Sequence, residues 1–288
     1  MPSLREVRRR IRSTQSTQKI TKAMQVVSAT KLRGAQQAVQ RARPYADKMT
    51  QVLATTAERA AQHKHPYLYR REGDRALVIV VTADQGLCGA LNSNTLRAVN
   101  RYVNRHHHGQ AKYVTIGRKG QTFLTRFRRE IIADASGIPD RSGIAPILPA
   151  VRAALDAYDS YEVDTVVLGY AKWISTLQQE ATVRTLLPIE IPKAEESDRL
   201  LADYEYEPDA AHVLDALLPR FIETEVYQAL LENQASFHSA RMVAMQNATN
   251  AADDMITSLT LTANKVRQAT ITTELMDIVN GAEALSQR

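Results

Sequence analysis

The segment from Thr82 to Asn94, TADQGLCGALNSN, holds the residues of this chain that are best suited to chemistry. It contains two glycines and Cys88, and it follows an apolar run and precedes a segment of helical composition. A glycine-rich turn before a helix can bind phosphate through backbone N–H groups. A thiol in the same place can have a lowered pKa. A phosphate site and a nucleophilic cysteine are therefore the two chemistries to consider.

The spacing of this segment argues against both chemistries. A phosphate-binding loop needs Gly-Lys-Ser/Thr after its glycines, and a dinucleotide-binding turn needs G-x-G-x-x-G; the sequence has neither pattern. Asn92 and Ser93 are instead typical of a helix N-cap. A nucleotide-dependent α/β enzyme stays an alternative that a nucleotide bound at Gly86 to Gly89 would support, but we expect no catalytic residues and no cofactor.

Metal ligands are equally sparse. Cys88 is the only cysteine of the 288 residues, which excludes an internal disulfide and a site built from several cysteines, and fits a reducing compartment. His106, His107 and His108 are consecutive, so their side chains diverge, and we expect an exposed polar loop there. The sequence therefore predicts no metal site.

The middle of the chain, residues 75–192, predicts an α/β domain that positions this segment. Short β-branched runs predict strands, and helical segments separate them. This alternation favours a Rossmann-like domain with a mainly parallel sheet, to which residues 178–189 add an edge strand. The predicted strands are 76–81, 112–116, 130–134 and 164–170, and the predicted helices are near 92–104, 120–126 and 144–158. An acidic linker, residues 193–209, comes after the domain.

The two ends of the chain, residues 1–61 and 210–288, predict long helices. Residues 3–33 contain no glycine or proline, and Pro44 is a place where the first helix could kink. Between Pro219 and Gly281, 61 residues contain neither residue type, which corresponds to a helix of roughly 90 Å. Apolar and small residues recur three, four or seven positions apart, so we expect the two ends to pair as an antiparallel coiled coil. The expected contact residues of the second helix are Phe221, Phe237, Ala244, Ala248, Ala252, Met255, Leu259, Val266 and Ile278.

The last turns of the second helix pose a separate question. The segment NKVRQATITTELMDIVNGAEAL, residues 264–285, interrupts its apolar positions with amides, threonines and an arginine. A helix that packs in a domain core normally has a cleaner apolar face. We therefore expect these turns to extend past the first helix and to face another protein.

Charge is concentrated at the N-terminus. The first 50 residues have a net charge of +10, whereas the whole chain has +6. A basic segment of this kind implies an acidic partner, which could be nucleic acid, anionic lipid or an acidic protein loop. A basic coiled-coil nucleic-acid-binding protein is therefore the second alternative, although Tyr45 is the only aromatic residue in the segment.

Five separated motifs resemble the gamma subunit of F-type rotary ATP synthases. They occur in the family's order and are STQKITKAMQVVSATKLR (16–33), GLCGALNSN (86–94), YEYEPD (204–209), ARMVAMQNATNAADDMI (240–256) and NKVRQATITTEL (264–275). The family's DRGLCGGLN appears here with Gln85 in place of arginine and Ala90 in place of glycine. The substitution at Gln85 weakens the expectation that a charge at this position contacts a partner.

The resemblance implies a non-catalytic central shaft. Such a shaft enters a ring of three alpha and three beta subunits, and its α/β domain lies beside the epsilon subunit and the ring of c subunits. Ion flow turns the c ring, and the shaft drives each beta subunit through its nucleotide states. The absence of a transit peptide before the first motif favours a bacterial source over a processed organellar chain, and with it a peripheral location on the cytoplasmic face of the cell membrane. The sequence does not specify the coupling ion.

The resemblance also implies roles for individual residues. Arg267 and Gln268 correspond to residues that hydrogen-bond a catch loop of a beta subunit, and Thr272 lies near them. Met24 corresponds to the shaft position that faces the acidic lever loop of beta, and Cys88 lies in a loop close to that region. The foot residues that meet the polar loops of the c ring correspond to Tyr206 and Glu207.

Overall fold

The computed structural model describes residues 3–60, 63–191 and 206–286, which form two compact units. One unit combines Met1–Val27 with Met242–Arg288, and the other is Ser28–Arg241. Two long helices contribute to both units, namely α1 (Leu4–Arg59) and α6 (Ala210–Ser286). Helix α1 continues through Pro44, so the proline does not end it. Most of the predicted acidic linker, residues 193–209, lies outside the described residues.

The Ser28–Arg241 unit contains the predicted sheet. Its strands have the spatial order β3-β2-β1-β4-β5, and all neighbours are parallel except β4 and β5. This confirms the mainly parallel sheet and the edge strand, which pairs antiparallel with β4. The strands are β1 (Ala76–Val81), β2 (Ala111–Ile116), β3 (Ile131–Ala135), β4 (Thr165–Trp173) and β5 (Gln179–Leu187).

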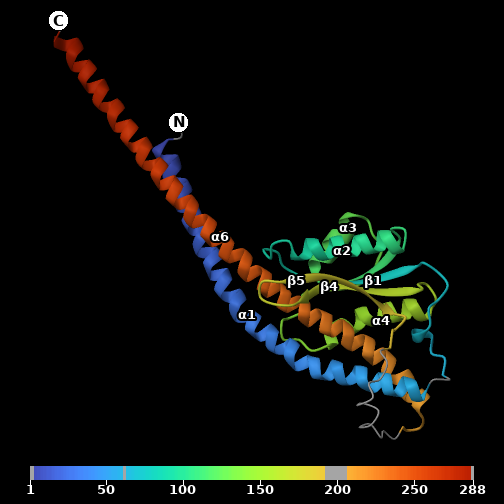
Figure 1. The fold of residues 1–288 in the computed structure, drawn as a ribbon. Coiled ribbons are helices and arrows are strands. Elements are labelled where there is room, and N and C mark those ends of the chain that lie inside the picture. Colours follow the sequence, from blue (N-terminus) through green and yellow to red (C-terminus); the bar gives the residue numbers. More distant parts are fainter. Residues whose placement is uncertain (1–2, 61–62, 192–205, 287–288) are drawn as a thin grey trace. The chain divides into compact units, whose positions relative to one another are not determined.

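Helices cover both faces of this sheet, as Figure 1 shows. Helices α2 (Leu91–His106) and α3 (Arg118–Arg126) cover one face, where Val78 and Val80 of β1 are buried. Helix α4 (Leu148–Asp159) and parts of α1 and α6 cover the other face, where Leu77 and Ile79 are buried. Because β1 is buried on both sides, all six of its residues are apolar. Two short 3₁₀ helices, η1 (Pro66–Leu68) and η2 (Ala145–Ile147), lie in the connections.

Within the same unit, α1 and α6 pack through small and apolar residues. Ala35 and Val39 of α1 form a buried cluster with Leu231 and Ala235 of α6. Leu53 of α1 is fully buried in the main core, to which α6 also contributes. Small side chains allow two helices to approach closely, as the sequence predicted.

In the unit formed by the two chain ends, α1 and α6 also pair, and polar contacts lie among the apolar ones. Thr14 contacts Met255, Gln18 donates to Asp253, and Gln25 donates to Gln246. The hydroxyl oxygens of Thr21 and Thr249 lie 2.8 Å apart and are buried. The partner number falls as the α1 number rises, so the pair is antiparallel. This confirms the predicted coiled coil in this part of the chain.

The residues that form this contact differ from those expected from apolar type alone. One series of buried and half-buried positions on α6 alternates spacings of four and three, and neighbours such as Ala244, Gln246, Ala248 and Thr262 are half-buried beside it. The series is Met245, Thr249, Ala252, Ile256, Leu259, Ala263 and Val266. Ala252, Leu259 and Val266 were predicted correctly, and the predicted Ala244 and Ala248 are half-buried. Met255 contacts Thr14 although it is 55% exposed, whereas Ile278 is 68% exposed. A coiled coil selects positions by a repeat of 3.5 residues, so an apolar residue out of phase with that repeat faces outward.

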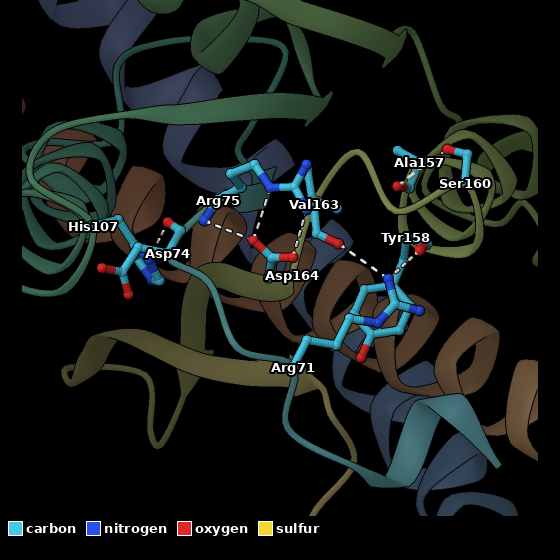
Figure 2. Close-up of polar contacts among 9 residues, drawn as sticks. All are labelled: Arg71, Asp74, Arg75, His107, Ala157, Tyr158, Ser160, Val163 and Asp164. Carbon is cyan, nitrogen blue, oxygen red and sulfur yellow. Dashed lines mark hydrogen bonds and ion pairs between the residues drawn. The ribbon is translucent and has the colours of Figure 1, made fainter.

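The amino ends of β1 and β4 are joined by an arginine cluster, drawn in Figure 2. The guanidinium of Arg75 donates to both oxygens of Asp164, at 2.7 and 2.9 Å, and the Asp164 side chain is only 4% exposed. The guanidinium carbon of Arg71 lies 3.6 Å from the ring centroid of Tyr158, and Arg71 donates to the carbonyl oxygens of Tyr158 and Val163. These contacts fix the segment that enters β1.

We expect Asp164→Asn to lower the free energy of unfolding by about 2 kcal/mol near neutral pH, because it removes a bidentate, charge-assisted contact. Arg75 lowers the pKa of the Asp164 carboxyl. The contribution is therefore complete above the unfolded carboxyl pKa of about 4 and is lost as the pH falls through the lower folded pKa.

Urea unfolding of the variant and of the parent chain at several pH values measures this difference, which should shrink in acid. Glu162→Gln is the control, because the pair of Glu162 with Lys112 is exposed. Equal effects of the two substitutions would contradict the assignment.

Candidate functional site

The end of α6 beyond Val266 is exposed on all sides. Every side chain from Arg267 to Asn280 is exposed, including large apolar residues. Arg267 and Gln268 are therefore fully available, and within the described part of the chain no hydrogen bond or ion pair holds their side chains. The exposed apolar residues are Ile271, Leu275, Met276, Ile278 and Val279.

Helical geometry places the predicted contact residues of this segment on neighbouring turns. Thr272 follows Gln268 by four positions, and its hydroxyl donates to the Gln268 carbonyl oxygen at 3.0 Å. Thr270 and Thr273 bond the helix backbone in the same way. These hydroxyls are therefore satisfied within the helix, and Arg267 and Gln268 supply the strong donors of the surface.

The partner helix in the same unit presents a basic surface. Met24 is half-buried, and Lys19 and Lys22 are exposed. Arg10 pairs with Glu6 at 2.9 Å across one helical turn, a pair that is exposed. The remaining cations near the start of α1 are exposed as well, namely Arg5, Arg8, Arg9 and Arg12.

Cys88 is buried, contrary to the activated thiol considered from the sequence. It is 3% exposed and packs with Leu91, Ala171 and Phe237. Burial raises the pKa of its thiol. Any contact of this loop with another protein would therefore involve exposed neighbours such as Leu87, which is 59% exposed, and not the thiol itself.

Asn92 does not cap helix α2, so the N-cap prediction was wrong. The helix begins at Leu91, and no side chain caps it. Asn92 instead accepts a hydrogen bond from the Ala83 N–H at 3.0 Å, and its amide donates to Cys88 Sγ at 3.4 Å. Asn92 therefore links Ala83, just after β1, to Cys88 in the turn. The local sequence does not reveal this contact.

The place where a phosphate would meet the start of α3 is filled by Asp84. Its carboxylate accepts the backbone N–H of Arg118 at 2.9 Å and that of Gly137 at 3.0 Å. The next two N–H groups of α3 donate to the Ala83 carbonyl oxygen and to the Thr82 hydroxyl. The amides that commonly bind phosphate at a helix start therefore already have partners at α3, whereas the Gly86 to Gly89 turn considered from the sequence precedes α2.

Tyr206 and Glu207 precede the start of α6, in the Ser28–Arg241 unit. The guanidinium carbon of Arg59 lies 5.5 Å from the Tyr206 ring centroid, and Glu207 is exposed. Asp209 caps α6 by accepting the His212 N–H at 2.9 Å. The first two residues of the motif YEYEPD lie outside the described residues. The structure does not bring Tyr206 together with the Cys88 loop in the part of the chain that it describes.

His107 is buried, and the exposed loop expected for all three histidines was wrong at this position. It is 8% exposed, and its Nδ1 lies 3.1 Å from the Asp74 carbonyl oxygen. His106 and His108 are exposed. Across the described ranges, no three His, Cys, Asp or Glu side chains gather closely enough to hold a metal ion. None of the described helices is both long and apolar enough to cross a membrane.

The apolar pattern of the sequence does not include the polar residues of α1 that contact α6. Thr21 and Gln25 follow Val7 and Ile11 in strict steps of three and four, so the repeat itself was the signal that could have identified them.

Comparison with known proteins gives one consistent result. The family model described as ATP synthase matches residues 3–285. An ATP synthase gamma chain from Ralstonia nicotianae is 43% identical over 291 residues, covering 99% of this chain and all of the relative. The gamma chain from Cupriavidus metallidurans is 44% identical with the same coverage.

Solved structures share the fold at lower identity. A chain of the Euglena gracilis mitochondrial ATP synthase has a TM-score of 0.68 at 17% identity, covering 98% of this chain and 94% of its own length. A chain from the central stalk and c-ring structure of the Tetrahymena thermophila mitochondrial ATP synthase has a TM-score of 0.60 at 24% identity, covering 80% and 99%. The full-length match to the family model and to gamma chains shows that this chain belongs to the ATP synthase gamma chain family.

Proposed function

We propose that this chain is the rotor shaft of an F-type ATP synthase, coupling ion-driven rotation of a c ring to conformational changes in three catalytic beta subunits. The observation that carries the proposal is the end of α6, where all side chains from Arg267 to Asn280 are exposed beyond the last buried position. Membership of the gamma chain family supplies the context. In this role the chain transmits torque and catalyses nothing itself.

The composition of the exposed surface from Arg267 to Asn280 suits rotation inside a ring of alpha and beta subunits. A continuous apolar face would bind one neighbour strongly and raise the barrier to turning. Around Arg267 and Gln268 this surface instead consists of amides, threonines and charged side chains, and its exposed apolar side chains lie farther along, from Ile271 to Val279. Arg267 and Gln268 then form directed contacts with a catch loop of one beta subunit, each worth about 1 to 3 kcal/mol. Thr272 lies beside them.

The basic surface of α1 complements acidic loops of beta. Lys19 and Lys22 are exposed and lie one helical turn apart just before Met24, so α1 presents cations to acidic loops near the expected contact of Met24 with the lever loop. In the other unit, the Cys88 loop meets beta through exposed residues such as Leu87.

Tyr206 and Glu207 are proposed to contact the polar loops of the c ring, with the epsilon subunit bound nearby. The similarity to bacterial gamma chains supports a place on the cytoplasmic face of a bacterial membrane. The same similarity disfavours the nucleic-acid alternative, because acidic loops of the beta subunits then serve as the partner of the basic helix α1.

We expect Arg267→Ala with Gln268→Ala to lower the ATPase rate of the assembled complex about tenfold, because two directed contacts per step are lost. ATP hydrolysis by the purified complex measures the effect. Asn264→Ala with Lys265→Ala is the matched control, since these exposed polar neighbours lie on the same helix. A normal rate and normal assembly of the first variant would discard the proposed catch.

The purified chain alone should hydrolyse no ATP, because the Gly86 to Gly89 turn lacks the phosphate-binding patterns and the Cys88 thiol beside it is buried. A coupled ATPase assay across a gel-filtration peak tests this. Turnover that follows the chain through the column would refute the non-catalytic role.

A further inference from the structure

The Ser28–Arg241 unit contains a cavity that the proposed shaft function does not use. It has a volume of about 430 Å³ and lies where β1, β2 and β3 end. Its walls come from the segments 82–85, 117–118 and 137–140, from residues 233–241 of α6, and from Lys31 of α1. Open α/β sheets generally bind ligands outside the carboxyl ends of their strands, and this cavity has that position.

The acidic side chains of the cavity are already occupied. Asp84 accepts the backbone N–H groups of Arg118 and Gly137. Asp140 lies 2.8 Å from Lys31 Nζ and 3.2 Å from His238 Nε2. His238 and Lys31 hold the pKa of Asp140 well below its ordinary value. The acceptors in the wall are therefore charged and paired, which leaves no attraction for a cation.

Several donors in the wall remain without partners in the described part of the chain. The His238 side chain is 3% exposed, and its Nδ1 has no hydrogen-bond partner; its Nε2 lies near Asp140 without forming a hydrogen bond. Arg241 uses Nη1 to donate to Gln85 at 2.7 Å, but its buried Nε also has no partner. The third donor is the exposed guanidinium of Arg118. Buried polar atoms are nearly always hydrogen-bonded. Two unpaired nitrogens in one wall, His238 Nδ1 and Arg241 Nε, therefore indicate that a bound molecule supplies the acceptor.

We propose that this cavity binds a small oxyanion of the size and charge of inorganic phosphate. His238 donates Nδ1–H to the anion, while Arg241 and Arg118 donate from α6 and from the start of α3. The three cations in the wall, Lys31, Arg118 and Arg241, outnumber the two carboxylates and favour a negative ligand. The site does not depend on the proposed shaft function.

Calorimetric titration of the purified full-length chain with inorganic phosphate tests the proposal. We expect one saturable site per chain and competition by sulfate. Arg118→Gln should weaken the Kd about tenfold, because it removes a charge-assisted donor. Arg126→Gln is the control, since Arg126 is exposed on the same helix and does not line the cavity. His238→Asn, checked for folding by circular dichroism, should weaken binding as well.

Three results would overturn the proposal. The first is the absence of saturable phosphate binding to the folded chain. The second is an equal loss of affinity in Arg118→Gln and Arg126→Gln, which would indicate a general charge effect. The third is saturable binding of an acidic peptide in this cavity without binding of phosphate, which would assign the donors to a protein partner.

Discussion

The antiparallel pairing of α1 and α6 occurs in both units and organises each of them. In the Ser28–Arg241 unit the pair is apolar, and its inner residues merge with the core beneath the sheet. In the unit of the two chain ends it is held by Thr21 with Thr249 and by paired amides and carboxylate. Burial of a leucine stabilises a contact by about 1.5 to 3 kcal/mol, whereas a net hydrogen bond contributes about 1 kcal/mol. The polar layers therefore contribute less stability than the apolar positions between them, such as Ala252 and Leu259, but layers of this kind fix the register of a coiled coil.

A fixed register determines where the exposed end of α6 lies along the axis of the pair. The repeat of half-buried positions stops at Val266, and the next residue, Arg267, is exposed. A shift of α6 along α1 by one turn would move the proposed contact residues by about 5.4 Å, more than a hydrogen bond can tolerate. The polar layers thus connect the packing of the helices to the position of the proposed catch residues.

The sequence predicted elements well where the signal is local or repetitive. The strands, the long helices and the parallel sheet follow from apolar runs and helical periodicity, and β1 was predicted with its observed bounds, Ala76–Val81. Predictions failed where a distant contact decides the role of a side chain. Asn92 looks like a cap but bonds the end of β1, and His107 looks exposed but bonds Asp74. The cavity at the strand ends could not be predicted, because its wall combines residues as distant as Lys31 and Arg241.

Whether α1 and α6 act as one body in the unit of the two chain ends can be tested with a single cross-link. The hydroxyl oxygens of Thr21 and Thr249 are 2.8 Å apart, so Thr21→Cys with Thr249→Cys places two thiols within reach of a disulfide. The native Cys88 is buried and does not interfere. We expect oxidation to form the disulfide, seen as altered gel mobility, and to leave ATP turnover of the assembled complex unchanged. Loss of turnover on oxidation, restored by a reductant, would show that the two helices move against each other and would contradict a shaft that turns as one body.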